Sequence, residues 1–341
     1  MRILIHAWCC SGGLTGPGAV AADTLHAEGR AMFTALVRDA RRDPSLEVTA
    51  LVDATRPLDL PPEVRIRAVP AGGELAALVA AAPCVDTVIV VAPETDGLLA
   101  ARVAAVRSAG GDALAPPPAF IIAAADKQAT TLALAAAGVP VPAGRRLAAG
   151  ESWPPEFIRP AVGKPLDGAG GDGIVHVAAT GSLPDAVSHP LRIEALVAGE
   201  PVGVSCLCGP DGIRPLAPLA QCFDAAGRFI GGVPLPDPAR GARASALGAR
   251  AVAALARATA APPRGWVGVD MILGPAADGR DDRVLEVNPR FTTSFLGHAA
   301  GTGPSLVRLV LEAAAGRALS LDSQPRAFQL ATDDRSTRRD G

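Results

Sequence analysis

The sequence predicts an α/β protein that begins with an open, doubly wound (Rossmann-like) sheet. Apolar and amphipathic runs alternate over the first third of the chain, and this β-α-β-α-β-α order is typical of such a sheet. One apolar run, Thr87–Ala92, is continuous, as parallel strands buried on both faces are. The expected elements, in order, are strand 2–9, glycine-rich loop 11–18, helix 19–43, strand 47–53, helix 75–82, strand 87–92 and helix 96–109.

The pattern changes after Pro116-Pro117-Pro118, where short apolar segments replace the regular alternation. The expected order is then helix 126–138, strands 161–164, 174–177, 192–196, 202–208 and 214–220, helix 242–260, strands 267–273 and 283–287, and helix 304–316. We therefore expect four segments: an N-terminal α/β domain (1–118), a small subdomain with a glycine-rich lid (119–198), a large subdomain with a metal site (199–321) and a disordered tail (322–341).

The composition argues against several classes of function. Only 19% of the 341 residues are charged and the net charge is -2, so no strong field attracts nucleic acid or an anionic membrane. Aromatic residues make up 3%, with no tyrosine, which disfavours a base-stacking surface. No apolar window reaches the ~18 residues that a spanning helix needs, and the six cysteines form no C-x2-C pair. These features predict a soluble, cytoplasmic protein and favour reduced thiols over a zinc site.

Lysine is almost absent: Lys127 and Lys164 are the only two among 32 lysine and arginine residues. A lysine kept in such a chain indicates a position where a compact ammonium group is needed. Lys127 follows Asp126 at the start of an expected helix, and Lys164 precedes the loop Asp167-Gly-Ala-Gly-Gly-Asp-Gly173. We expect both lysines to bind phosphate, with chance retention on the surface as the alternative.

The loop 167–173 has four glycines in seven residues, and glycine lets backbone N–H groups approach an anion closely. The spacing matches neither a Walker loop nor G-x-G-x-x-G, and an ordinary hairpin turn is the alternative. With Lys164 on the strand before it, the loop is typical of a lid over a nucleotide phosphate. The expected phosphate contacts within the loop are Gly168, Ala169, Gly170 and Gly171.

Two glutamates and the backbone near them could hold a nucleoside. An adenine ring needs an acceptor for its amine and an N–H for a ring nitrogen, and Glu194 with the backbone near Val197 could supply both. Glu200, just past a turn glycine, could accept hydrogen bonds from ribose hydroxyls. A solvated strand end explains the same glutamates equally well.

Two neighbouring strands carry the sharpest pattern. Asp270 lies in the expected strand 267–273, and Glu286 and Asn288 lie in 283–287 and directly after it. Residues i and i+2 of a strand face one side, so Glu286 and Asn288 project together while Val287 points into the core. The turn-rich segment 274–282 brings Asp270 alongside, and such oxygens are hard ligands suited to Mg²⁺. Arg290 then places a guanidinium next to the expected metal site.

Together these motifs resemble the ATP-grasp superfamily of carboxylate–amine ligases over residues 126–300. The resemblance implies an ATP-grasp fold behind a Rossmann-like pre-ATP-grasp domain, and an ADP-forming ligase with an acyl-phosphate intermediate. D-alanine–D-alanine ligases have an arginine where this chain has Gly268, so a dipeptide-forming cell-wall role is disfavoured. The implied ATP contacts are Lys127, Lys164, the glycine loop, Glu194, Val197 and Glu200. The implied ligands of two Mg²⁺ ions (or Mn²⁺) are Asp270, Glu286 and Asn288, and the implied catalytic residues are Arg290 and Lys164.

Three segments resemble the tyramine–glutamate ligases of methanofuran biosynthesis: Glu28-Gly-Arg-Ala-Met32, Ala92-Pro-Glu-Thr-Asp-Gly97 and Asn288-Pro-Arg-Phe-Thr-Thr-Ser294. This resemblance implies an amide between glutamate and an aromatic amine or amino acid (tyramine or tyrosine), in a pathway to a methanofuran-like one-carbon carrier. Another amino-acid or peptide ligase of the superfamily, or a non-catalytic nucleotide-binding regulator, is the alternative. The acceptor identity, the activated carboxyl and the oligomeric state stay open, and a homo-oligomer is compatible with the sequence.

The substrates are expected where the first domain meets the metal site, because open α/β sheets bind ligands outside the carboxyl ends of their strands. Ordinary turn chemistry is the alternative for each residue there. The candidates are Ser11, Gly12, Gly13, Asp53, Glu94 and Thr95 at strand ends, with Thr293 and Ser294 after Arg290.

Overall fold

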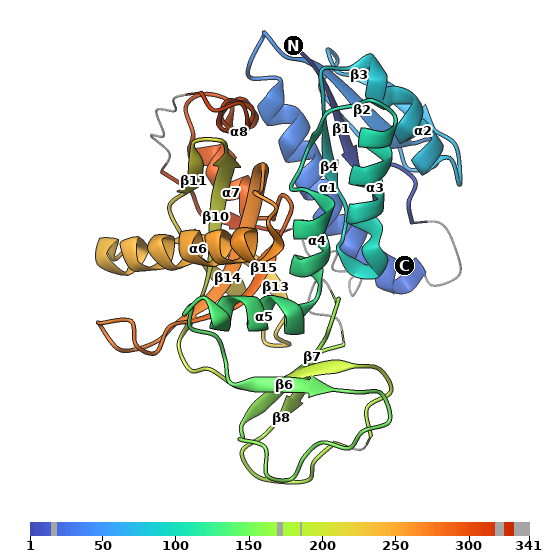
Figure 1. The fold of residues 1–341 in the computed structure, drawn as a ribbon. Coiled ribbons are helices and arrows are strands. Elements are labelled where there is room, and N and C mark those ends of the chain that lie inside the picture. The colour runs from blue at the N-terminus through green and yellow to red at the C-terminus, as the bar shows by residue number, and fades with distance from the viewer. Residues whose placement is uncertain (15–18, 169–172, 185, 318–323, 331–341) are drawn as a thin grey trace, which may run out of the picture.

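The computed structural model describes residues 1–14, 19–168, 173–184, 186–317 and 324–330. Figure 1 shows three parts: an N-terminal α/β domain at the upper right, a larger sheet crossed by a long helix in the middle, and a small sheet at the bottom. Among the described residues, no helix is both long enough and apolar enough to cross a lipid bilayer.

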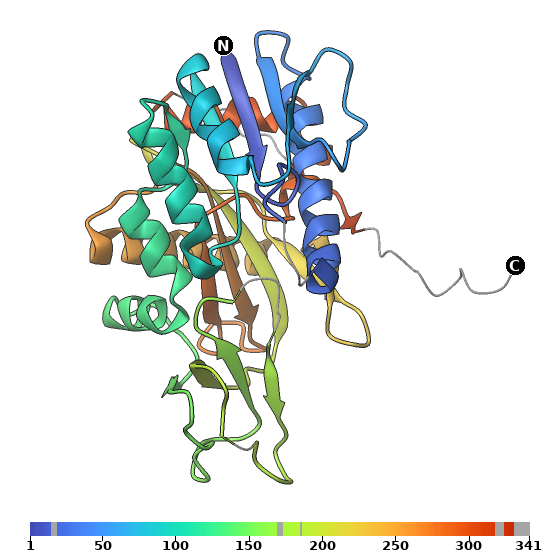
Figure 2. The same ribbon diagram turned by 90° about the vertical axis from the view of Figure 1, so that its right-hand side faces the viewer.

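The N-terminal sheet is parallel, with the strand order β3-β2-β1-β4-β5. Its strands are β1 (Arg2–Ala7), β2 (Glu47–Asp53), β3 (Arg65–Val69), β4 (Thr87–Val91) and β5 (Ala113–Leu114). Figure 2 shows helix α1 (Ala19–Ala40) on one face and helices α2 (Glu74–Ala81) and α3 (Leu98–Ser108) on the other. Two short 3-10 turns, η1 (Ala82–Cys84) and η2 (Thr95–Gly97), precede β4 and α3. This architecture confirms the doubly wound first domain.

The proline run is more than a linker, because Pro118 begins a helix. Helix α4 (Pro118–Ala125) uses proline in its first turn, where a missing N–H costs nothing. Helix α5 (Lys127–Ala136) follows at once, and both helices pack on β15 and on α6 of the larger sheet. The segment 119–198, expected as a small subdomain, therefore contributes two helices to the larger layer.

The small sheet is antiparallel, with the order β6-β9-β7-β8, and packs around Trp153. Its strands are β6 (Gly144–Leu147), β7 (Ala161–Pro165), β8 (Val175–Val177) and β9 (Leu191–Ala195). β7 carries Lys164 and β9 carries Glu194, so these two side chains come from neighbouring strands.

The larger sheet is antiparallel, with the order β15-β14-β10-β12-β13-β16 and β11 paired to β10. Its strands are β10 (Glu200–Gly209), β11 (Gly212–Pro215), β12 (Leu219–Phe223), β13 (Phe229–Pro234), β14 (Gly265–Leu273), β15 (Arg283–Asn288) and β16 (Phe328–Gln329). The expected strand 214–220 is thus two strands, β11 and β12. β16 lies in the segment expected as a disordered tail, where it pairs with β13.

Three helices complete this part: α6 (Pro238–Thr259), α7 (Phe295–Gly301) and α8 (Leu306–Ala314). α6 covers one face of the sheet, where Val202, Val269 and Met271 are buried against it. α7 and α8 pack against α1, and α8 also contacts β10 and β14. The first domain and the larger sheet therefore share one hydrophobic core, in which Phe33 of α1 lies with Phe291 and Phe295.

Candidate active site

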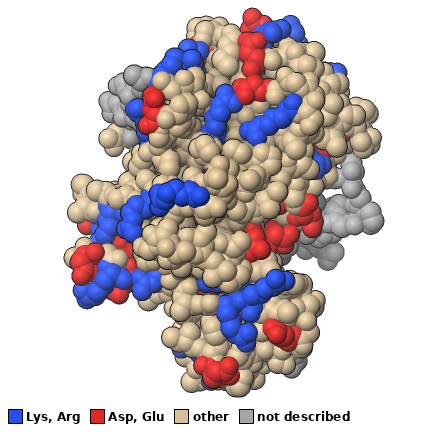
Figure 3. All heavy atoms as spheres, in the orientation of Figure 1, with Lys and Arg blue, Asp and Glu red and all other residues tan. Residues whose placement is uncertain are grey.

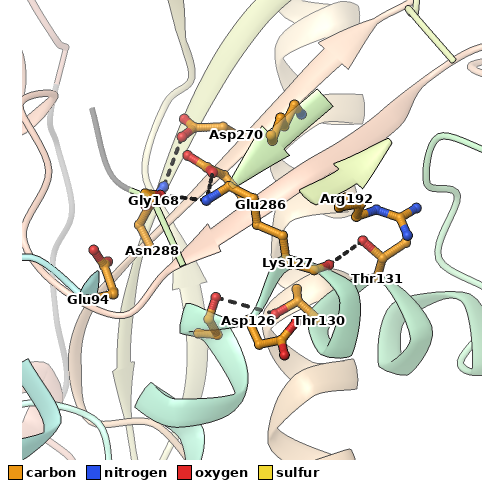
Figure 4. Close-up of polar contacts among 12 residues, drawn as sticks. Glu94, Asp126, Lys127, Thr130, Thr131, Gly168, Arg192, Asp270, Glu286 and Asn288 are labelled. Carbon is orange, nitrogen blue, oxygen red and sulfur yellow. Dashed lines mark hydrogen bonds and ion pairs between the residues drawn. The ribbon is translucent and has the colours of Figure 1, made fainter. Parts of the chain in front are cut away.

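The expected metal ligands Asp270, Glu286 and Asn288 lie close together on the hairpin of β14 and β15. Asp270 lies opposite Glu286 in the strand register, and Gly268 lies opposite Asn288. The side-chain amide of Asn288 donates to Asp270 Oδ2 at 2.8 Å (Figure 4). Val287 between them is 2% exposed and packs in the core, as the alternation predicts. The hairpin therefore presents two carboxylates and one amide on a single face.

Charge within this hairpin is only partly compensated. Desolvation and the charge of Glu286 raise the pKa of Asp270 to about 7. Burial alone would raise the pKa of Glu286, but Lys127 and Lys164 outweigh it and lower that pKa. The Nζ atom of Lys127 lies 3.6 Å from Glu286 Oε2. Such crowded acidic groups are typical of functional sites rather than of structural ion pairs.

The donor set fits a hard divalent cation. Two carboxylates and one amide oxygen are too few for an all-protein cage, and Mg²⁺ usually takes one or two carboxylates together with substrate phosphates. Gln221, which the sequence did not single out, adds an amide that donates to Asp270 Oδ1 at 2.7 Å. If the side-chain amide of Gln221 or Asn288 rotated about its terminal bond, its oxygen could bind the cation instead.

The two lysines reach the same space from different elements. Asp126 caps α5 by accepting hydrogen bonds from the backbone N–H groups of Gln128 and Ala129, which fixes Lys127 in the first turn. The Nζ atom of Lys127 donates to the carbonyl of Gly168 at 2.5 Å, at the start of the glycine loop (Figure 4). Lys164 Nζ lies 2.8 Å from Glu194 Oε2. Ala169, Gly170 and Gly171 lie outside the described residues.

Arg192 organises this corner and was not predicted. Its side chain is 1% exposed, and its guanidinium donates to Glu194 Oε1 at 2.6 Å, to Gln128 Oε1 at 2.6 Å and to the carbonyl of Pro142 at 3.1 Å. Glu194 thus lies between a buried arginine and Lys164. The alternation of Arg192 with Glu194 on one strand face was the available signal. Val197 follows in segment 196–199, which joins the two sheets.

Glu200 does not join these residues. It pairs with Leu273 in the register of β10 and β14, on the face that carries Val202 and packs on α6. Gly203, three residues further on, lies on the other face, where its Cβ position would be 3.5 Å from Asp270 Oδ1. The carboxylate of Glu200 pairs with Arg240 of α6 at 2.8 Å. The structure therefore separates Glu200 from the other expected ATP contacts.

Arg290 connects the hairpin to the first domain. Its Nε donates to Glu94 Oε2 at 3.0 Å, and Glu94 directly follows the end of β4. Burial would lower the pKa of Arg290, but Glu94, Glu286 and Asp270 together raise it. The next residue, Phe291, stacks on Trp266 with a ring separation of 5.3 Å, which anchors the backbone of Arg290. The guanidinium is thereby held beside the carboxylates.

Most other expected substrate residues serve local structure. The Ser11 hydroxyl donates to the carbonyl of Leu51, and Asp53 accepts from Thr55. Gly12 has a φ of +93°, and a Cβ on Gly13 would clash with the Trp8 indole. Ser294 hydrogen-bonds Ser205 and Thr292. Thr95 begins η2 next to Glu94, and Thr293 is partly buried after Arg290. Only Glu94 of the six strand-end candidates contacts Arg290.

The chain is similar to known families and structures. The family model of the ATP-grasp domain matches residues 124–294, and that of the pre ATP-grasp 3 domain matches residues 46–121. No curated protein sequence matches the chain.

Three solved structures illustrate the likeness of fold. An ATP-grasp superfamily protein from Archaeoglobus fulgidus has a TM-score of 0.69 and 17% identity, over 97% of this chain and 100% of that one. A biotin carboxylase from Campylobacter jejuni, in a β-γ-ATP complex, has a TM-score of 0.68 and 14% identity, over 94% of this chain and 72% of that one. An L-amino acid ligase from Bacillus licheniformis has a TM-score of 0.58 and 16% identity, over 92% and 73%.

Proposed function

The chain belongs to the ATP-grasp family, and we propose on this premise that it is an ATP-dependent, ADP-forming carboxylate–amine ligase. The observation that carries the proposal is the position of Lys127, which contacts both the glycine loop at Gly168 and the hairpin carboxylate Glu286. The ammonium group of Lys127 thus lies between a glycine-rich loop of the kind that binds phosphate and the acidic hairpin. This position suits a lysine that binds a triphosphate together with its metal ion.

We assign roles by chemistry and position. Lys127, Lys164 and the loop from Gly168 through Ala169, Gly170 and Gly171 would bind the phosphates. Glu194 and the backbone near Val197 would hold adenine between the two sheets. Asp270, Glu286 and Asn288 would hold Mg²⁺, for which Mn²⁺ could substitute. The ribose role expected of Glu200 is not carried forward, because its carboxylate lies on the α6 face of the sheet.

Catalysis would rest on positioning and charge stabilisation. A substrate carboxylate attacks the γ-phosphate of ATP to form an acyl phosphate and ADP, and Mg²⁺ held by Asp270, Glu286 and Asn288 would offset charge on the phosphates. Lys127 and Lys164 orient the phosphates from two sides. An amine then attacks the acyl carbon and phosphate leaves, while Arg290, held by Glu94, stabilises the oxyanion of that step. The shared buried core behind Arg290 keeps this guanidinium fixed.

For the substrates we propose glutamate and an aromatic amine or amino acid, with tyramine or tyrosine as the acceptor, in methanofuran-like carrier biosynthesis. Support comes from the meeting of three segments that resemble the tyramine–glutamate ligases. Met32 and Phe291 share one hydrophobic core, and Glu94 binds Arg290. Glu28 lies close enough to Arg290 for the guanidinium to oppose the rise in the Glu28 pKa that burial causes.

The test is Mg²⁺-dependent ADP release with L-glutamate, with tyramine or tyrosine as the second substrate and with each substrate omitted in turn. The proposal expects release that requires glutamate and one acceptor, and a loss of at least about 100-fold in Lys164→Arg with folding retained. Arg146→Lys, on exposed β6, is the matched control and should behave as wild type. ATP binding without ADP release under any combination would contradict the proposal, and release with other amino acids would redirect it to a peptide ligase.

A further inference from the structure

Arg192 joins the two parts of the molecule that carry the lysines of the proposed phosphate site. Lys127 lies in the first turn of α5, which packs on the larger sheet and α6, whereas Lys164 lies on β7 of the small sheet. Arg192 lies on β9, directly opposite Lys164 in the strand register. From there its guanidinium reaches the side chain of Gln128 on α5, the residue next to Lys127. One side chain therefore spans the space between the elements that carry the two lysines.

Each of the three guanidinium nitrogens of Arg192 has a different partner. Nε donates to Glu194 Oε1 at 2.6 Å, Nη1 to Gln128 Oε1 at 2.6 Å, and Nη2 to the carbonyl oxygen of Pro142 at 3.1 Å. These acceptors lie on β9, on α5 and in the segment 137–143 between α5 and β6. A planar guanidinium with every nitrogen engaged is held in one orientation, and the compact ammonium group of a lysine cannot reproduce this fork.

The burial of Arg192 is unusual for the small sheet. Figure 3 shows basic side chains on the surface of this sheet, at the bottom of the view, and Arg145 and Arg146 of β6 are exposed there. Arg192 lies opposite Arg146 in the register but is 1% exposed. Two residues before Arg146 is Gly144, where a Cβ would lie 2.3 Å from the carbonyl oxygen of Ile193 and 3.0 Å from Arg192 Nη2. Because a buried guanidinium is costly unless it is fully paired, this position depends on the three partners of Arg192.

The same contacts leave a positive charge at Lys164. Glu194 has one negative charge and two cationic partners, because Arg192 donates to Oε1 and Lys164 Nζ lies 2.8 Å from Oε2. Arg192 is enclosed by protein and cannot reach a ligand, whereas the Lys164 side chain is 14% exposed. The excess positive charge of the three residues is therefore available to an anion at Lys164.

We propose that Arg192 is a positioning residue that sets the distance between Lys127 and Lys164, and with it the affinity for the nucleotide phosphates. It acts through Gln128, the chain neighbour of Lys127, and through Glu194, the ion-pair partner of Lys164. The inference rests on the proposed function, because it takes both lysines as phosphate ligands. It predicts that a change at Arg192 weakens the binding of ligands that carry the phosphates and leaves the binding of the nucleoside alone unchanged.

Binding can be measured without turnover, by calorimetry with Mg²⁺ and the non-hydrolysable ATP analogue AMP-PNP, and with adenosine as the probe that lacks phosphate. Arg192→Lys keeps a cation beside Glu194 but cannot also reach α5. We expect this variant to weaken AMP-PNP at least about tenfold and adenosine by less than about twofold. Arg243→Lys is the matched control, because Arg243 is also partly buried but bonds to Asp282 instead of a neighbour of either lysine. It should bind both probes as wild type does.

Gln128→Leu tests the connection to α5 separately and leaves Arg192 paired with Glu194. Gln128 is only partly buried, so this variant keeps the test decisive even if Arg192→Lys does not fold. It should also weaken AMP-PNP and leave adenosine unchanged. The double variant should bind AMP-PNP no more weakly than the weaker single variant, because both changes break one connection. Additive losses would contradict the inference, since they would show that the two residues act independently.

A second arm uses steady-state kinetics with the full chain. Arg192→Lys should raise the KM for ATP at least about tenfold and leave the KM values for the carboxylate and the amine within about twofold. Unchanged affinity for AMP-PNP in both single variants, or an equal loss for AMP-PNP and adenosine, would overturn the inference even if the ligase is active. A loss confined to AMP-PNP, with the control unchanged, would support it even if no ADP is released, in which case the proposed reaction alone fails. A wild type that does not bind AMP-PNP would overturn both.

Discussion

Two acidic clusters in this protein differ in how their charge is compensated. In the first domain, Glu74 is 5% exposed and lies 2.7 Å from His6 Nε2 and 2.9 Å from Arg102 Nη2. Burial would raise the pKa of Glu74, but hydrogen bonds from His6 and Arg102 outweigh it and lower that pKa. We call these three residues the closed cluster, because one acid has two partners from its own chain.

The hairpin of β14 and β15 has the opposite arrangement. Asp270 lies against a second acid, Glu286, and its direct hydrogen-bond donors are the neutral amides of Gln221 and Asn288. We call this pair the open cluster. A protein tolerates such a pair where function needs it, since a bound cation would supply the missing charge. The contrast separates an acid that stabilises the fold from acids arranged for a ligand.

The largest expected effect comes from the open cluster. Glu286→Gln should lower ligase turnover at least about 100-fold, because it removes a metal oxygen and the charge facing Lys127. The free energy of unfolding should fall by no more than about 1 kcal/mol, because relief of the repulsion with Asp270 partly offsets the lost attraction of Glu286 to Lys127 and Lys164. ADP release and urea unfolding measure the two quantities. Turnover near that of wild type, or a clear loss of stability, would place this residue with the closed cluster.

The closed cluster should give the reverse result. Glu74→Gln leaves the guanidinium of Arg102, which is 14% exposed, without a counter-charge, so we expect a loss of about 3 kcal/mol in the free energy of unfolding. The folded fraction should keep its turnover, because none of the three residues contacts Arg290 or the hairpin in the described structure. Asp86→Asn, which breaks an exposed pair with Arg2, is the control and should not be measurably destabilising.

The pH dependence of stability should have opposite signs for the two clusters. In metal-free protein, the folded pKa of Asp270 is about 7, above its ordinary value of 3.8, so the folded state binds the extra proton. The contribution of Asp270 to the free energy of unfolding is therefore lost as the pH rises from about 4 to about 7. The lowered pKa of Glu74 acts oppositely, and its contribution is lost as the pH falls below the ordinary value of 4.5.

Melting temperatures between pH 5 and pH 8, measured with a chelator, test the Asp270 part. In the wild type we expect the free energy of unfolding to decline by about 1 kcal/mol as the pH rises, and Asp270→Asn should remove this decline. The value is modest because the Glu286 side chain is 34% exposed and water screens the repulsion. An unchanged slope in the variant would mean that Asp270 ionises normally in the folded protein.

The sequence predicted the open cluster because its signal is local. Alternation on a strand has a fixed period of two, so Glu286 and Asn288 had to share a face whatever the rest of the fold did. The turn-rich segment 274–282 then indicated that the preceding strand, with Asp270, lies alongside. The closed cluster could not be predicted, since His6 and Glu74 lie 68 positions apart and belong to no motif.

The strand ends of the first domain show where local reasoning fails. Ser11 and Asp53 lie at carboxyl ends of strands, as Glu94 does, yet their side chains bond to Leu51 and Thr55 nearby. Small polar side chains at turns often satisfy neighbouring backbone groups. Only the tertiary contact with Arg290 distinguishes Glu94, and no periodicity encodes that contact.

The smallest expected effect concerns Glu200, an acid that belongs to neither cluster. Its side chain is 37% exposed and pairs with Arg240, which is 34% exposed, so the pair should contribute little. Glu200→Gln should change the free energy of unfolding by less than about 0.5 kcal/mol and leave the KM for ATP within about twofold. Ile272→Ala is the comparison variant: Ile272 lies on the same partly buried face of β14 as Asp270, and its truncation should raise that KM. A tenfold rise in the KM for ATP in Glu200→Gln alone would restore the ribose role, and would require the segment 196–199 to turn the carboxylate away from α6 when ATP binds.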